Sequence, residues 1–337
     1  MKSAKRPVRM ADIARAAGVS VMMVSRAYRD GGSVSEEKRA HILRIAEEMG
    51  YVFDATAANL RLNRTGFVAV TVPSINNANF ADTVRALGDA LAREGLQILL
   101  ANTEYDPDAE ARLLDQLLRR KPEALVVTGG DHGEQARKLL QRAGVPVVEI
   151  WDLPAAPIGH AVGFSNSDAM VDLVGHFARA GYRRLAFIGG ETPFDSRGRD
   201  RRAGFIRGVA QHGLGPPRLV DAGEVPVSMS AGAGALAQLL AQYPDTDAVL
   251  CVSDLVAFGA MTEAQRRGLR IPQDLAFGGF GNFEIGRVSL PQITTVEVSA
   301  AQIGARAARL VLDLLADPAR APARIDMQPY VIARGSS

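Results

Sequence analysis

From residue 66 onward, short apolar runs alternate with longer amphipathic stretches. The runs have the length and β-branched content of buried strands, and the stretches repeat their apolar residues at the helical period. Such alternation predicts parallel sheets with helices on both faces. Strands are predicted at 67–72, 96–101, 124–128, 145–150, 160–164, 184–189, 218–222, 248–252 and 274–280, and helices at 81–94, 108–120, 134–143, 168–180, 200–212, 230–242, 255–267 and 300–315. The spacing repeats over two halves, which predicts two doubly wound subdomains with a cleft between them.

The first fifty residues follow a different pattern, in which short helical faces replace the apolar runs. Apolar residues spaced for two helices lie on either side of Gly18, within the sequence AGVS. Gly18 can take a positive φ in a tight turn, and Ser20 can cap the following helix. The pattern predicts a helix-turn-helix, although it also fits an ordinary helical hairpin. A third helix is predicted over 35–49, capped by Ser35, with inward-facing side chains at Ile42, Ile45, Ala46 and Met49.

Charge separates this N-terminal segment from the rest of the chain. Residues 1–30 carry seven Lys and Arg against two Asp, whereas the whole chain has a net charge of only +2. A basic head on a near-neutral body favours an anionic partner, which for a helix-turn-helix is DNA. Cys251 is the only cysteine, which excludes an intrachain disulfide. The sequence has neither a signal-peptide run nor eighteen consecutive apolar residues, so a cytoplasmic protein without a membrane span is expected.

Signatures of catalysis and of cofactor binding are missing from the sequence. It contains no G-x-S-x-G motif, no P-loop and no G-x-G-x-x-G that opens a helix, and its five histidines are not spaced as a metal pair. We therefore expect a protein that is not an enzyme and that needs no metal and no cofactor. His132 follows the third predicted strand and is expected, at most, to contact a ligand.

Longer motifs in the head resemble a known family. The runs MADIARAAGVS and VSEEKRAHILRIAEEMGYVFDATAANLR resemble the headpiece and hinge of the LacI/GalR family of bacterial repressors. The family has Pro-Asn where Phe53 and Asp54 stand here, and Thr as the first helix cap where Arg9 stands. The resemblance implies a DNA-binding headpiece over 1–53, a hinge helix and linker over 54–65, and an effector-binding and dimerisation core over 66–337.

The same resemblance assigns contacts with DNA. It implies that Val21 and Met22 make apolar contacts with base edges in the major groove, and that Arg26 hydrogen-bonds a guanine. It also implies that Leu60 of the hinge wedges between base pairs in the minor groove. A plain linker with an incidental Leu is the alternative for this segment. The further expected DNA contacts are Lys5, Arg6, Ser20, Ser25 and Ala57.

The core resembles the type I periplasmic sugar-binding fold that the family shares. The motifs VTVPSINNANF, AVGFSNSDA, RDRRAGF, CVSDLVAFGAM and LPQITTVEVS occur in family order. The expected fold class is an α/β core of two doubly wound parallel-sheet subdomains with an all-α helix-turn-helix headpiece. The first subdomain is expected near 66–160 plus 290–320, and the second near 163–288 plus 322–337. The motifs, and the rule that ligands bind beyond the carboxyl ends of such strands, nominate Ser74, Phe80, Glu149, Asp152, Phe164, Asn166, Arg201, Asp254 and Asn282 as effector contacts.

Within the family, the segments TVPSINNANFADTVRAL, GVPVVEIWDLPAAPIGHAVGFSN and GGFGNFEIGR most resemble gluconate-operon repressors. This implies gluconate or a related sugar acid as the effector, with positive charge offered by Arg197, Arg199, Arg201 and Arg202. The expected protein is a repressor that binds a pseudo-palindromic operator as a homodimer and is released by its effector. Two alternatives remain: a solute- or sugar-binding receptor with the same core, and a regulator of the same family that responds to a neutral sugar.

Overall fold

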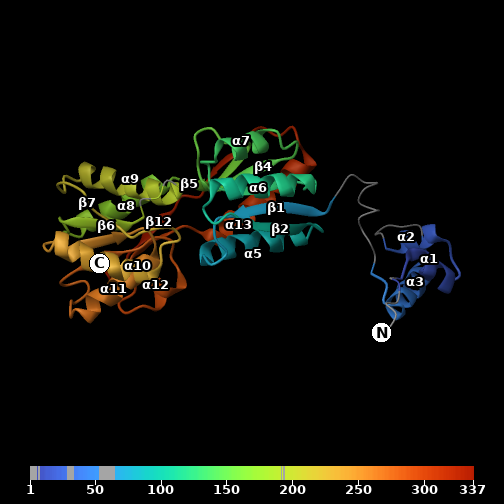
Figure 1. Ribbon diagram of the computed structural model, residues 1–337, viewed down its shortest axis with the longest axis horizontal. Coiled ribbons are helices and arrows are strands. Elements are labelled where there is room, and N and C mark those ends of the chain that lie inside the picture. The colour runs from blue at the N-terminus through green and yellow to red at the C-terminus, as the bar shows by residue number, and fades with distance from the viewer. Residues whose placement is uncertain (1–5, 7, 29–33, 53–64, 191, 193) are drawn as a thin grey trace. The chain divides into compact units, whose positions relative to one another are not determined.

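The chain folds into two compact units, residues 1–65 and 66–337 (Figure 1). The computed structural model describes residues 6, 8–28, 34–52, 65–190, 192 and 194–337. Lys5, Ala57 and Leu60, three of the expected DNA contacts, therefore lie outside the described residues, as do Phe53 and Asp54. No helix in the described part of the chain is both long and apolar enough to cross a membrane.

The N-terminal unit is a bundle of three helices around a small core. Helices α1 (Met10–Ala16), α2 (Val21–Ala27) and α3 (Glu36–Glu48) bury Ile13, Ala14, Val24, Ala27, Ile42 and Ala46. Gly18 has a φ of +66° in the turn between α1 and α2, as the sequence predicted. Two expectations for the third helix differ from the structure: the Ser35 side chain makes no capping bond, and Met49 is exposed because the helix has ended before it.

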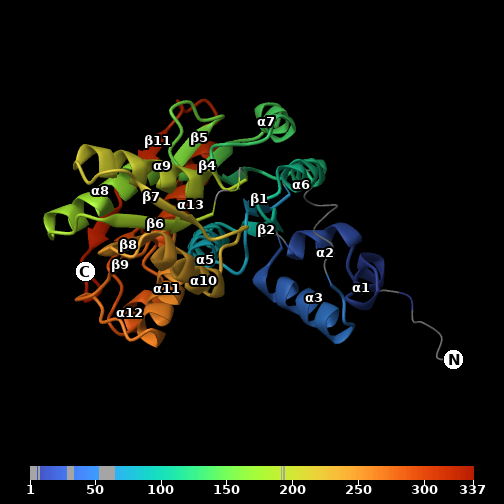
Figure 2. The ribbon, with the colours of Figure 1, turned by 60° about the vertical axis from the view of Figure 1, so that its left-hand side comes forward.

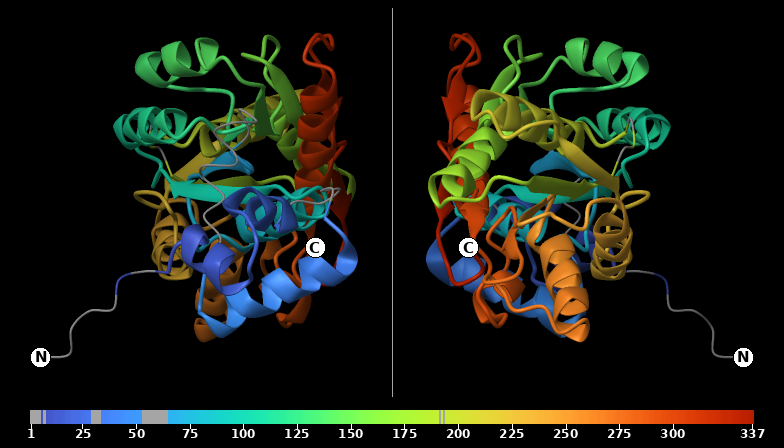
Figure 3. Two further views of the ribbon diagram at one scale, coloured as in Figure 1. Left: turned by 90° about the vertical axis from the view of Figure 1, so that its right-hand side faces the viewer. Right: turned by 90° about the vertical axis from the view of Figure 1, so that its left-hand side faces the viewer.

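The first subdomain of the core is built on a parallel sheet of six strands, in the order β11-β5-β4-β3-β1-β2. Alternate residues of β1 face opposite layers: Val68 and Val70 pack with α5 and α13, and Ala69 packs with α6 and α7. Helix α13, red in Figure 3, returns from the C-terminal part of the chain to pack on α5. The strands are β1 (Phe67–Val72), β2 (Gln97–Asn102), β3 (Leu125–Thr128), β4 (Val147–Asp152), β5 (His160–Phe164) and β11 (Arg324–Asp326), and the helices are α5 (Ala78–Ala92), α6 (Pro107–Arg119), α7 (Glu134–Gln141) and α13 (Ala300–Ala316).

The second subdomain has a parallel sheet of four strands, in the order β7-β6-β8-β9. Helices α8 and α9 pack together on one side and α10 and α11 on the other (Figures 1 and 2). Gly204 of α9 is required by this packing, since a Cβ there would lie 2.2 Å from the carbonyl oxygen of Ser167. The strands are β6 (Leu185–Gly189), β7 (Arg218–Asp221), β8 (Ala248–Cys251) and β9 (Ala276–Gly278), and the helices are α8 (Asn166–Arg179), α9 (Ser196–Gln211), α10 (Met229–Gln242), α11 (Asp254–Arg266) and α12 (Glu284–Val288).

The chain crosses between the subdomains three times, and the crossings shift the expected boundaries. Strand β5 belongs to the first sheet and is followed directly by α8 of the second subdomain. Strand β10 (Thr295–Glu297) pairs with β12 (Tyr330–Ile332) before the chain enters α13. Strand β11 lies in the first sheet, although 322–337 was expected in the second subdomain. The two-subdomain α/β core with an all-α head is confirmed, and the short strands β10 to β12 were not predicted.

Candidate functional site: the outer face of α2 and the cleft of the core

The outer face of helix α2 carries the residues expected to read DNA bases. The Oγ of Ser20 accepts a hydrogen bond from the backbone N of Met23 at 3.2 Å and so caps the helix. Val24 and Ala27 are fully buried, whereas Val21 and Met22 are 46% and 64% exposed. Because the buried positions already hold the helix in the bundle, Val21 and Met22 are not needed for its core. Arg26 is exposed on the same helix.

Two of the further expected DNA contacts, Ser25 and Arg6, lie in different surroundings. Ser25 is half-buried on α2, and Arg6 forms an ion pair with Asp12 at 2.8 Å. The Asp12 carboxylate also accepts a hydrogen bond from the backbone N of Arg9 at 3.0 Å, and this bond lowers the pKa of Asp12. Asp12 thus makes the reciprocal bond of a capping box, in which the third residue of the helix accepts from the backbone N–H of the cap residue.

The core contains a polar cleft between its subdomains, formed by two adjoining cavities. The larger has a volume of about 260 Å³. Asn77, Tyr105, Asp195, Arg201, Ser253 and Phe283 line both cavities. Asn79, Phe80, Trp151, Arg197 and Phe280 line the inner cavity, and Ser74 and Met229 line the outer one. These residues follow or face the carboxyl ends of the strands, where open α/β sheets bind their ligands.

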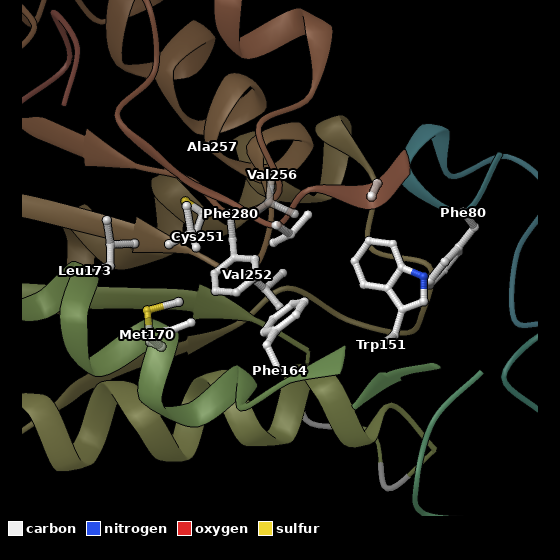
Figure 4. Close-up of a cluster of buried hydrophobic side chains, with 14 of the residues drawn as sticks. Phe80, Trp151, Phe164, Met170, Leu173, Cys251, Val252, Val256, Ala257 and Phe280 are labelled. Carbon is white, nitrogen blue, oxygen red and sulfur yellow. The ribbon is translucent and has the colours of Figure 1, made fainter. Parts of the chain in front are cut away.

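A chain of aromatic rings lies beside the cleft (Figure 4), and three of its members, Phe80, Trp151 and Phe280, line the inner cavity. The ring of Phe80 lies 5.2 Å from that of Trp151, Trp151 lies 6.1 Å from Phe164, and Phe164 stacks on Phe280 at 6.3 Å. Phe80 comes from α5 and Phe280 follows β9, while Trp151 is the last residue but one of β4 and Phe164 is the last residue of β5. The rings that line the cavity offer the apolar face of a sugar ring or carbon chain a fixed surface.

Arg201 lies at the centre of the polar contacts. Its Nε donates to Oδ1 of Asn166 and one terminal nitrogen donates to the carbonyl of Val252, both at 2.9 Å. The guanidinium lies 3.9 Å from the centre of the Phe280 ring. Burial lowers the pKa of Arg201 to about 10, so the group remains charged at neutral pH.

Arg197 places a second cation in the cleft, one turn before Arg201 on α9. One terminal nitrogen lies 3.9 Å from Oδ2 of Asp152, and the guanidinium lies 5.6 Å from the centre of the Phe80 ring. Burial acts to lower the pKa of Arg197, but Asp152 and Asp195 outweigh that effect and raise it. Burial also raises the pKa of Tyr105, so its phenol stays protonated and can donate a hydrogen bond.

Only some of the effector contacts expected from the sequence line the cleft. Ser74, Phe80 and Arg201 do so. Asp152, Phe164 and Asn166 line a second cavity, of about 260 Å³, and contact the cleft residues from behind. Asn166 connects these two sets, because its Nδ2 donates to Oδ1 of Asp152 at 3.0 Å while its Oδ1 accepts from Arg201.

The carboxylate of Asp254 points into the protein instead. It is fully buried, accepts a hydrogen bond from the backbone N of Phe283 at 2.7 Å, and also accepts one from the Thr295 hydroxyl. Burial raises the pKa of Asp254 to about 6. The cap of α11 is Ser253 and not Asp254. Asp254 therefore fixes the 280–283 loop that forms part of the cleft wall.

Glu149 and Asn282 are also held by protein groups. Glu149 accepts a hydrogen bond from the backbone N of Ile158 at 2.6 Å and lies 3.7 Å from Nε2 of His132. The other ring nitrogen of His132 lies 2.8 Å from Glu110. Burial acts to lower the pKa of His132, but the two glutamates outweigh it and raise the pKa to about 9. The amide oxygen of Asn282 accepts from Arg334 at 2.6 Å.

The sequence did not nominate several residues of the cleft. Tyr105 and Trp151 lie at the carboxyl ends of β2 and β4, so the rule that nominated Ser74 applies to them equally. Asp195 comes from the long β6–α9 connection, where no periodic pattern marks a position. The others are Asn77, Asn79, Ser253, Phe280 and Phe283, and Arg197 was noted only for its charge.

A helix-turn-helix unit joined to a two-subdomain core with a polar cleft defines the class of ligand-controlled DNA-binding regulators. The model of the "Bacterial regulatory proteins, lacI family" matches residues 9–54, and that of the "Periplasmic binding protein-like domain" matches 174–337. The chain belongs to the LacI family of bacterial transcription regulators, and it is not an enzyme.

Two relatives extend along nearly the whole chain. The HTH-type transcriptional regulator GntR of Pseudomonas aeruginosa is 34% identical over 97% of this chain and 94% of its own length. The HTH-type transcriptional regulator GntR of Escherichia coli K12 is 30% identical over 99% of both chains. The solved structure of a LacI family transcriptional regulator from Silicibacter pomeroyi is 32% identical, covers 98% of this chain and 99% of its own, and superposes with a TM-score of 0.89. Head and core are thus joined in one protein in the relatives as well.

Proposed function

We propose that this protein is a repressor that binds a pseudo-palindromic operator as a homodimer and is released by a sugar acid, gluconate or a close relative. The sugar acid follows from the charges of the cleft and from the resemblance of the core to gluconate-operon repressors. The homodimer follows from the two-fold symmetry that such operators share with the proteins that bind them.

The observation that carries the proposed effector is the pair of guanidinium groups in the cleft. Arg197 and Arg201 line the inner cavity; among the described residues, Asp195 adds a carboxylate to the lining and Asp152 lies 3.9 Å from Arg197. The two guanidinium groups suit an acid, because a guanidinium offers parallel donors to a carboxylate. Asn77, Asn79 and Ser253 add polar atoms that suit hydroxyl groups, and the aromatic rings suit a carbon chain.

The DNA-binding function is supported by the surface of α2. Exposed Val21 and Met22 suit thymine methyl groups, and exposed Arg26 suits the O6 and N7 of guanine. The effector is expected to weaken operator binding by about 5–150-fold, the usual range of coupling between two sites. It can do so only by binding one arrangement of the core more tightly than the other.

Calorimetric titration of the full-length protein with gluconate, 6-phosphogluconate, idonate, glucose and galactose tests the effector. Fluorescence anisotropy on the operator, with and without the bound compound, tests its consequence. Binding of an acid with loss of operator affinity is the expected result. Binding of neutral sugars only would discard the acid and favour the neutral-sugar regulator. Binding of a sugar by a protein that binds no operator would favour a solute receptor.

A further inference from the structure

Trp151 is held in an unusual backbone conformation at the cleft. Its φ is +77°, in the left-handed region that bulky side chains rarely adopt. It is the last residue but one of strand β4 in the first subdomain, and its carbonyl lies 3.4 Å from the side-chain amide of Asn166, which begins α8 of the second. Asn166 in turn accepts from Arg201. A strained backbone conformation persists only when the surrounding structure holds it in place, and residues in such conformations cluster at ligand sites.

The indole ring of Trp151 is held by its neighbours, but its nitrogen has no hydrogen-bond partner in the described part of the chain. The residue is 2% exposed, and edge-to-face contacts with Phe80 and Phe164 set the direction of the ring. Figure 4 shows the indole nitrogen on the side of Phe80. This Nε1 is buried without a hydrogen-bond partner among the described residues. An indole N–H can only donate, and a buried donor that stays unpaired destabilises the protein.

The ring nevertheless lines the inner cavity, beside Arg197 and Arg201. A residue retained for packing alone would serve as well with a phenyl ring, which carries no donor. The cavity adjoins the ring, and an oxygen atom of a molecule bound there would satisfy the donor. Burial of the N–H and its unmet hydrogen bond therefore both point to a ligand.

We propose that Trp151 is a ligand contact of the cleft, whose indole N–H donates a hydrogen bond to an oxygen of the bound sugar acid. This contact rests on the proposed function, and it adds a residue that determines how tightly the acid is held. The cation of Arg197 neutralises the acid group, and Trp151 fixes the position of the oxygen.

The test compares Trp151→Phe with the wild-type protein, both full-length. The substitution removes the donor and, because a phenyl ring is smaller than an indole, part of the packing on Phe80 and Phe164. Calorimetry should show gluconate binding weakened by about 10-fold, the cost of one hydrogen bond of about 1.4 kcal/mol. Operator affinity without gluconate should be unchanged, and the melting midpoint should fall only by what the smaller ring loses in packing. Tyr182→Phe, which removes a hydroxyl from an aromatic residue packed on Phe177 outside the cleft, is the matched control.

A second measurement uses the wild-type protein alone. Trp151 is the only tryptophan, so the ¹⁵N-labelled protein has a single indole N–H resonance. This resonance should shift downfield when gluconate saturates the cleft. Wild-type affinity in Trp151→Phe, or an indole resonance that does not move, would overturn the contact and leave the proposed function standing; the N–H would then simply pack against Phe80. A wild-type protein that does not bind gluconate would overturn both.

Discussion

Replacement of Arg201 by Met measures what its guanidinium contributes to the core. The substitution removes the hydrogen bonds to Asn166 and to the Val252 carbonyl, and it removes the charge above the Phe280 ring. Hydrogen bonds made by charged groups contribute roughly 1.5–3 kcal/mol each, and the lower value applies because water can enter the cleft. Two bonds give a loss of about 3 kcal/mol. At roughly 2–4 °C per kcal/mol for a large domain, the melting midpoint of the core should fall by about 6–12 °C.

Differential scanning calorimetry of the full-length protein is the assay, and Arg207→Met is the control. Arg207 lies on the same helix and pairs with Asp168, but both side chains are largely exposed. Exposed pairs contribute about 0–1 kcal/mol, so this variant should melt close to the wild-type protein. If both variants melt together, the internal contacts of Arg201 do not stabilise the core and the reasoning is refuted. Calorimetry with gluconate on the same samples should show binding lost in Arg201→Met and kept in Arg207→Met.

Two further predictions concern the head and a buried histidine. Arg26→Ala should weaken specific operator binding by about 1–3 kcal/mol and relax the preference at one base pair; an unchanged profile in selection from a randomised operator library would remove Arg26 from the readout. His132 has a folded pKa of about 9, above its ordinary 6.5, so the stability it contributes is complete below pH 6.5 and is lost as the pH rises through 9. His132→Gln should therefore flatten the decline in stability between pH 7 and 9.5 in urea titrations, and an identical decline in both proteins would contradict the buried ionised histidine.

The bounds of a strand or helix are predicted accurately where the element buries enough apolar side chains to leave a pattern in the sequence. Strands β1 and β5 begin and end at the predicted residues, because these runs of six and five residues are largely buried and lie between polar or glycine-containing segments. Strands β10, β11 and β12 have only three residues each, and most side chains of β11 and β12 are partly or fully exposed, so these strands leave no apolar run to detect. Helix α9 begins at Ser196, four residues earlier than predicted, because its first turn is polar and shows no apolar periodicity.

Residues of the candidate site could be predicted only where their position after a strand is enough to place them in the cleft. Ser74 and Phe80 follow β1, and the rule for carboxyl ends places them correctly in the cleft. Asp254 sits at an equivalent position after β8, but its carboxylate turns inward to the backbone N of Phe283. That contact spans 29 residues, and no local pattern reveals which of two available directions a side chain takes. The distant partner, and not the motif, decides whether the carboxylate meets a ligand.

The contacts across the cleft suggest how a ligand can select one arrangement of the core. Asn79 of the first subdomain donates to the carbonyl of Gly281 in the second at 2.9 Å, and Arg197 of α9 reaches Asp152 of β4. These contacts are the protein's own, and they favour the arrangement that makes them. A ligand held by Trp151 on one side and Arg201 on the other would add bonds that exist only when both sides are in place. Its binding free energy would then favour that arrangement in proportion to those bonds. The extent to which a ligand changes operator affinity should accordingly depend more on the contacts that it makes with both sides of the cleft than on its total binding affinity.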